Sequence, residues 1–134
     1  MKYAADKQER YTLLRLQDSN VNSVVAPELK SELVVLANEG IRNLILDLSD
    51  VEYVDSSGLS AVLTAKRLWD QQGSFVVTGV KHANVKKLFE ISRLDTILTI
   101  VPTVEEAVDY VYMEDVEREL TKEGDDALAG GDAA

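Results

Sequence analysis

The stretch "NLILDLSDVEYVDSSGLSAVL", residues 43–63, joins an apolar segment to a helical one through a polar turn. Residues 43–48 form an apolar run of the kind found in strands that are covered on both faces. Apolar residues recur at helical spacing over residues 56–72, and Gly73 is a typical helix stop. The stretch therefore predicts a central strand, a turn and a helix in direct succession.

The same alternation of strand-like and helix-like segments continues on both sides of this stretch. The expected strands are residues 3–6, 11–16, 43–48, 74–79 and 97–100. The expected helices run from Pro27 to Gly40, over 56–72 and 83–92, and onward from Thr103, which forms a capping box with Glu106. Because long helical connections favour parallel neighbours with right-handed crossovers, we predict a single-domain α/β fold. Its sheet is expected to be mixed and mostly parallel, with about four to five strands and about four flanking helices.

Composition is that of a soluble globular protein of one domain. The chain has 134 residues, of which 46% are hydrophobic and 28% charged, enough to bury a core. The absence of cysteine excludes disulfide frameworks, thiolate metal sites and thiol nucleophiles. No apolar run approaches the roughly 18 residues that cross a bilayer, and "MKYAADKQER" lacks the apolar core of a signal peptide. We therefore expect a cytoplasmic protein without a membrane partner.

The formal net charge of -10 is concentrated at the C-terminal end. From Glu114 onward there are eight acidic and two basic residues, so this segment carries -6 and residues 1–113 carry -4. This acidity argues against binding to nucleic acid, which requires a clustered basic face. The nearest approach to a basic patch is a group around one helix start, which we interpret as a solvated face: Lys81, His82, Lys86 and Lys87.

The acidic end divides into a helical part and a tail. Apolar residues four apart favour a helix that continues to about Thr121: Val108, Tyr112, Val116 and Leu120. The segment "EGDDALAGGDAA", which closes the chain, has little to bury and is expected to be disordered. We accordingly divide the chain into a core domain, residues 1–113, and an acidic extension with a disordered tail, residues 114–134.

The turn Asp55-Ser56-Ser57-Gly58 allows two interpretations. The simpler one is a helix N-cap, because serine and aspartate side chains satisfy the unpaired amide groups of a helix start. A cap does not explain Gly58, since glycine inside a helix costs about 1 kcal/mol relative to alanine. A bare backbone would let another group approach closely, and the amides of a first helical turn suit an anion such as a serine-linked phosphate.

A serine between strand and helix is also where α/β hydrolases place their nucleophile. That arrangement needs Gly-x-Ser-x-Gly, whereas Val54 and Asp55 precede Ser56. His82 is the only histidine, and we interpret it as a solvent-facing residue. Three carboxylates flank a strand end and need no catalytic explanation: Asp47, Asp50 and Glu52. Because phosphate loops and metal-ligand clusters are also lacking, we predict no enzymatic activity and no cofactor or metal.

The helix after the turn has one apolar face and one apolar flank. The face predicts contact with the core and comprises Gly58, Ala61, Val62, Ala65, Leu68 and Trp69. Leu59 and Leu63 lie outside it, beside Ser60. These two leucines either pack under a neighbouring helix or loop, or form a patch that binds a partner.

The segments "LILDLSDVEYVDSSGLSAVL" and "GSFVVTGVKHANVKKLFEISRLDTILTIVPTVEEAV" resemble the STAS domain of bacterial anti-sigma factor antagonists, over roughly residues 10–112. The resemblance implies that Ser56, ahead of Ser57, is phosphorylated by a partner kinase that is itself the anti-sigma factor. Unphosphorylated antagonist would bind this kinase, phosphorylated antagonist would release it, and a serine phosphatase would restore binding. ATP would be bound by the kinase. The implied docking surface comprises Asp55, Ser56, Ser57, Gly58, Leu59, Ser60 and Leu63.

One segment departs from the family pattern, and one alternative function stays open. Family members commonly carry a Gly-x-x-Asp-like turn before the first helix, whereas this chain has "LQDSNVNSVVAPEL", in which Asp18 or Asn20 is a candidate replacement. The alternative is a STAS module of another assembly, such as a signalling scaffold or a lipid-transporter subunit, in which the turn docks without phosphorylation. We expect a monomer or a weak homodimer.

Overall fold

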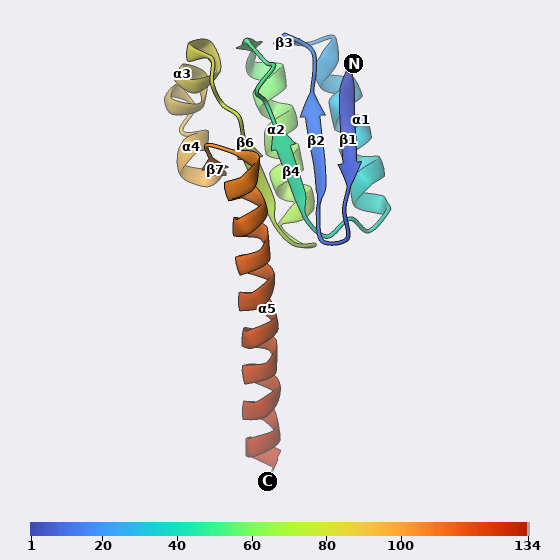
Figure 1. The fold of residues 1–134 in the computed structure, drawn as a ribbon, viewed down its shortest axis with the longest axis vertical. Helices are drawn as coiled ribbons and strands as arrows, with labels where there is room; N and C mark the ends of the chain where they lie inside the picture. The colour runs from blue at the N-terminus through green and yellow to red at the C-terminus, as the bar shows by residue number, and fades with distance from the viewer. Residues whose placement is uncertain (134) are drawn as a thin grey trace.

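A five-stranded sheet of order β1-β2-β4-β6-β7 forms the centre of the protein (Figure 1). The computed structural model describes the backbone of residues 1–133 and the side chains through Thr121. Only β1 runs antiparallel to its neighbour, so the sheet is mixed and mostly parallel, as predicted. The strands are β1 (Tyr3–Lys7), β2 (Thr12–Leu16), β4 (Leu44–Asp47), β6 (Phe75–Thr78) and β7 (Thr99–Val101).

Helices cover both faces of the sheet. Figure 1 shows α1 and α2 behind the sheet and α5 in front of it. Leu44 and Leu46 join the core cluster that includes α1 and α2, whereas Ile45 joins a second cluster with residues of α5. The apolar run at 43–48 is therefore the central, doubly covered strand that the sequence predicts. The helices are α1 (Val25–Asn38), α2 (Ser56–Trp69), α3 (Ala83–Ile91), α4 (Leu94–Ile97) and α5 (Val104–Ala133).

The expected strand at 97–100 is wrong in its position. The short helix α4 occupies residues 94–97, and β7 begins only at Thr99. The backbone amide of Leu98 donates to the carbonyl of Leu94 at 2.8 Å, and both side chains are buried. The apolar run is therefore divided between one helical turn and a strand, which also accounts for a fifth helix.

Helix α5 starts as predicted but ends later than predicted. The hydroxyl of Thr103 accepts a hydrogen bond from the amide of Glu106 at 3.2 Å, as an N-cap requires. The helix continues past the expected end near Thr121 as far as Ala133 and extends beyond the sheet (Figure 1). The segment that was expected to be disordered lies beyond the residues whose side chains are described, and that expectation stays a prediction.

One buried carboxylate fixes α5 on the sheet. Asp115 is 1% exposed, and its oxygens accept from the side-chain amide of Asn43 at 3.2 and 3.3 Å and from Arg118 at 3.0 Å. Arg42 and Arg10 lie 3.5 and 3.8 Å from the same carboxylate. This cluster, the Asp115 cluster, connects the helix to the start of β4.

A second, two-stranded sheet was not predicted. It pairs β3 (Asn20–Val21) with β5 (Tyr53–Val54) in parallel. Two residues are too few to show a strand periodicity, so the sequence carries no signal for either strand. The small sheet matters because β3 leads into α1 and β5 leads into α2.

Candidate functional site

The β3–β5 pair brings the starts of α1 and α2 together at one end of the fold. The amide of Asp55, just after β5, donates to the carbonyl of Val21 in β3 at 3.3 Å. From the other side, the side-chain carbonyl of Asn84, in α3, accepts from the amide of Val54 at 3.2 Å. The turn that carries the serines is therefore held by two neighbouring segments of the chain.

Asp55 caps helix α2, so the N-cap interpretation is confirmed for this residue. Its backbone is extended, with φ -103° and ψ -173°, and its carboxylate accepts from the amide of Gly58 at 3.1 Å. Its carbonyl accepts from the amide of Leu59 at 3.0 Å. The cap uses the aspartate, which leaves the hydroxyls of Ser56 and Ser57 unneeded for this purpose.

Gly58 is a glycine because of the chain's own packing. A Cβ atom at this position would lie 2.5 Å from the carbonyl oxygen of Val21 and 2.6 Å from Cγ1 of Val54. The group that approaches the bare backbone is therefore the β3–β5 pair, which corrects the interpretation of an external group. Gly58 is also buried, and its place on a docking surface stays a prediction.

The other predicted residues divide into an exposed and a half-buried group. Asp55, Ser56 and Ser60 are exposed, and Ser57 is half-buried. Leu59 and Leu63 are half-buried and pack against the main core cluster, which favours the packing interpretation of these leucines over a patch that binds a partner. The hydroxyl side of α2 is therefore more exposed than its leucine flank.

A groove of about 320 Å³ separates the hydroxyl side of α2 from α1. The ammonium group of Lys30, from α1, donates to the hydroxyl of Ser60 at 3.1 Å. Val24 and Tyr53, in the segments that precede α1 and α2, are 72% and 58% exposed. We call this the serine groove; it is lined by Ser23, Ala26, Pro27, Lys30, Ser56, Ser57 and Ser60.

The α1 side of the site was not identified from the sequence. Lys30 and Ser60 are thirty residues apart, and nothing in the local pattern of either segment joins them. The turn before α1 also differs from expectation. The side-chain oxygen of Asn22 accepts from the amides of Val24 and Val25 at 3.0 and 3.3 Å, so Asn22 holds this turn. Asp18 instead accepts from the amide of Lys2, and Asn20 lies in β3.

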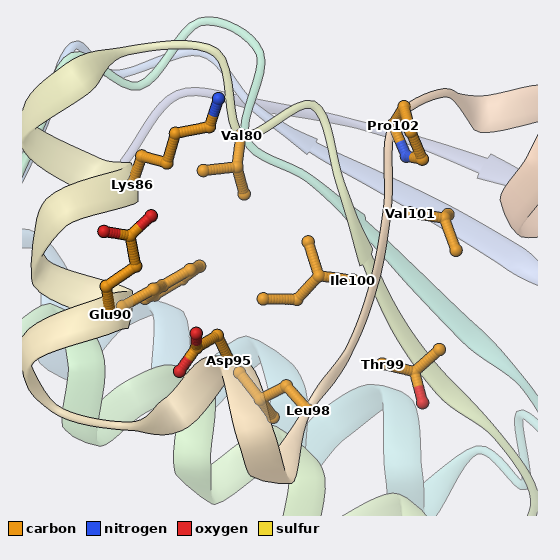
Figure 2. Close-up of a pocket in the computed structure, with 10 residues that line it drawn as sticks. Val80, Lys86, Glu90, Asp95, Leu98, Thr99, Ile100, Val101 and Pro102 are labelled. Carbon is orange, nitrogen blue, oxygen red and sulfur yellow. The ribbon is translucent and has the colours of Figure 1, made fainter.

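A larger hollow of about 580 Å³ lies between α3, α4 and β7, apart from the serine groove. Its apolar residues include Phe89 and Ile100. Figure 2 shows Lys86, Glu90 and Asp95 on one side of Ile100, projecting from α3 and α4. Lys86, one of the residues weighed as a basic patch, lines it together with Glu90 and Asp95. This part of the surface is therefore mixed in charge.

The described residues include neither a membrane-spanning helix nor a candidate metal site. Across residues 1–133, no helix is long and apolar enough to cross a membrane. No group of at least three histidine or acidic side chains in the described part is placed to hold a metal ion.

The fold and the serine turn define the class of protein. The sequence profile of the STAS domain matches residues 2–107, and the chain belongs to the STAS domain family. Among its relatives, BtrV of Bordetella bronchiseptica, assigned as an anti-sigma factor antagonist, is 36% identical over 108 residues, which cover 80% of this chain and 91% of BtrV.

Solved structures of anti-sigma factor antagonists share the fold. The antagonist from Mycobacterium paratuberculosis superposes with a TM-score of 0.76 at 19% identity, over 83% of this chain and 93% of that one. The phosphorylated form of the Bacillus cell fate determinant SpoIIAA superposes with a TM-score of 0.63 at 19% identity, over 82% and 99%. The resemblance stated from the sequence is thereby confirmed for the family and the fold.

Proposed function

We propose that this chain is an anti-sigma factor antagonist whose binding to a kinase-type anti-sigma factor is switched off by phosphorylation of Ser56. The observation that carries the proposal is the position of Ser56, exposed at the first residue of α2 on a turn fixed by its surroundings. The relationship to BtrV and the existence of a phosphorylated SpoIIAA support it. In this proposal the chain is a cytoplasmic regulator without catalytic activity or cofactor of its own.

The chemistry requires only an accessible hydroxyl. The kinase would transfer the terminal phosphoryl group of its ATP to the Ser56 oxygen, with loss of the hydroxyl proton and release of ADP. A serine phosphatase would return the hydroxyl by hydrolysis. Asp55 caps the helix without help from Ser56, and Gly58 packs against Val21 and Val54. Neither step therefore requires α2 to unfold.

Added charge is sufficient to expel a bound partner. A phosphoserine carries about -1.5 to -2 charges near pH 7. At about 5 Å from an acidic group on the partner, with an effective dielectric constant of about 20, the repulsion is roughly 3 kcal/mol per pair of unit charges. That energy corresponds to more than a hundredfold loss of affinity, at about 1.4 kcal/mol per factor of ten.

The test begins with the partner that co-purifies with the chain from its own cells. Ser56→Ala should retain this partner and Ser56→Asp should weaken its binding, with Thr64→Ala, lower on the same helix, as the control. Mass spectrometry of the native protein should find the phosphoryl group on Ser56. Phosphorylation confined to another residue, or equal binding by the two Ser56 variants, would contradict the switch and leave a STAS module that docks without phosphorylation.

A further inference from the structure

The serine groove contains a positively charged side chain, that of Lys30, beside the proposed phosphorylation site. Among the described residues that line it, Lys30 alone is charged. Its ammonium group donates to Ser60 at 3.1 Å, from the opposite wall of the groove. Ser56 lies one helical turn before Ser60, so their Cβ atoms are about 5–6 Å apart on one face of α2.

Lys30 is free to move toward Ser56. Its hydrogen bond to Ser60 is exposed, so water can replace the hydroxyl as a partner of the ammonium group when the bond breaks. The lysine side chain is long and flexible, with three donors on its ammonium group. Lys66, the basic residue one helical turn beyond Val62 on α2, instead pairs with Asp70 at 2.6 Å. Lys30 is thus the cation available to a new negative charge in the groove.

We infer that Lys30 is the internal receptor for the phosphoryl group on Ser56: it exchanges Ser60 for a phosphate oxygen and draws the group into the serine groove. The inference rests on the proposed function, because it concerns the state that phosphorylation of Ser56 creates. It adds a second cause of partner release. A phosphoryl group held between α1 and α2 fills space that the unphosphorylated protein offers to a partner side chain.

This arrangement also predicts that aspartate is a poor substitute for phosphoserine. A carboxylate on the shorter aspartate side chain carries one charge and sits closer to the α2 backbone than a phosphoryl group does. It reaches less far toward Lys30 and leaves more of the groove open. Ser56→Asp should therefore release the partner less completely than the phosphorylated chain.

The test uses full-length chain with phosphoserine encoded at position 56, so that it depends on no kinase. The titration midpoint of the phosphate, followed by ³¹P NMR, should lie about half a pH unit lower with Lys30 than in Lys30→Met, because a nearby cation favours the dianion. Lys30→Arg should keep the low midpoint. Lys7→Met is the control, since it removes one lysine that pairs with Glu39, far from the groove.

The outcomes separate this inference from the proposed function. A midpoint that Lys30→Met leaves unchanged, or that Lys7→Met raises equally, would overturn the role of Lys30 without touching phosphorylation of Ser56. A rise confined to Lys30→Met supports it. Circular dichroism of each variant shows that it is folded, and a raised midpoint in a folded Lys30→Met protein reports the lost cation.

Discussion

Gly58→Ala is the substitution that tests most directly how the serine turn is built. In an open helix this change would stabilise the protein, because alanine is favoured over glycine by about 1 kcal/mol. Here the new methyl group would lie 2.5 Å from the carbonyl oxygen of Val21 and 2.6 Å from Cγ1 of Val54. The first of these atoms is backbone and cannot move without disturbing the β3–β5 pair.

The expected change in the free energy of unfolding follows from comparing the cost of the clash with the gain in helix propensity. Overpacking of this kind costs typically about 1–3 kcal/mol, and loss of the hydrogen bond from Asp55 to Val21 adds about 1 kcal/mol. After the gain of about 1 kcal/mol in helix propensity is subtracted, the free energy of unfolding should fall by about 2 kcal/mol. With a urea dependence of about 1–3 kcal/mol per molar, the unfolding midpoint should fall by about 1 M.

Equilibrium urea unfolding followed by circular dichroism measures this loss. Thr64→Ala, a half-buried position on the same helix, is the matched control and should change the free energy of unfolding by less than about 0.5 kcal/mol. A Gly58→Ala protein as stable as wild type would refute the close approach. If that stable protein also lost its partner, the bare backbone at Gly58 would instead allow a group of the partner to approach, which is the interpretation made from the sequence alone.

Three further predictions concern the contacts that hold the site and α5. Asn84→Ala removes the acceptor for the amide of Val54, so the amide hydrogen of Val54 should exchange with solvent faster and the free energy of unfolding should fall by about 1 kcal/mol. Unchanged exchange would contradict a stabilising role of this hydrogen bond. Asp115→Ala removes the carboxylate that accepts from the buried amide of Asn43 and pairs with three arginines, and urea unfolding should show that the free energy of unfolding falls by about 2 kcal/mol. A loss no larger than that for Asp109→Ala, at an exposed position, would show that the cluster does not hold α5. The hydroxyl of Tyr110 donates to Glu114 at 2.5 Å, which raises the pKa of Tyr110, so the folded state keeps this proton more tightly. Its stabilising effect is present below the ordinary tyrosine pKa of about 10 and is lost as the pH rises through the higher folded value. In Glu114→Gln, the midpoint of the tyrosine absorbance titration should move down, and an unmoved midpoint would contradict the hydrogen bond as the cause.

The features that could be predicted from the sequence are those with a local cause. The central strand followed from an uninterrupted apolar run, and the starts of α2 and α5 followed from the cap chemistry of Asp55 and Thr103. The position of Ser56 at the start of α2 also followed, because the helix was predicted to begin at residue 56.

The features that could not be predicted depend on partners far apart in the chain. Lys30 meets Ser60 across thirty residues, and Asn43 meets Asp115 across seventy-two. Gly58 was singled out correctly as unusual, but its cause lies in Val21, a residue of a strand too short to show a pattern. The expected strand at 97–100 begins too early because the end of a single helical turn has the same apolar composition as a strand.

The pairing of β3 with β5 has a consequence for the speed of the proposed switch. Both walls of the serine groove emerge from this one ladder, so their separation is set before any partner arrives. A partner that docks there would spend little entropy on ordering the surface, and no slow rearrangement would intervene between modification and release. Under the proposed function, the lifetime of each complex would then be governed by the rates of phosphorylation, dephosphorylation and diffusion.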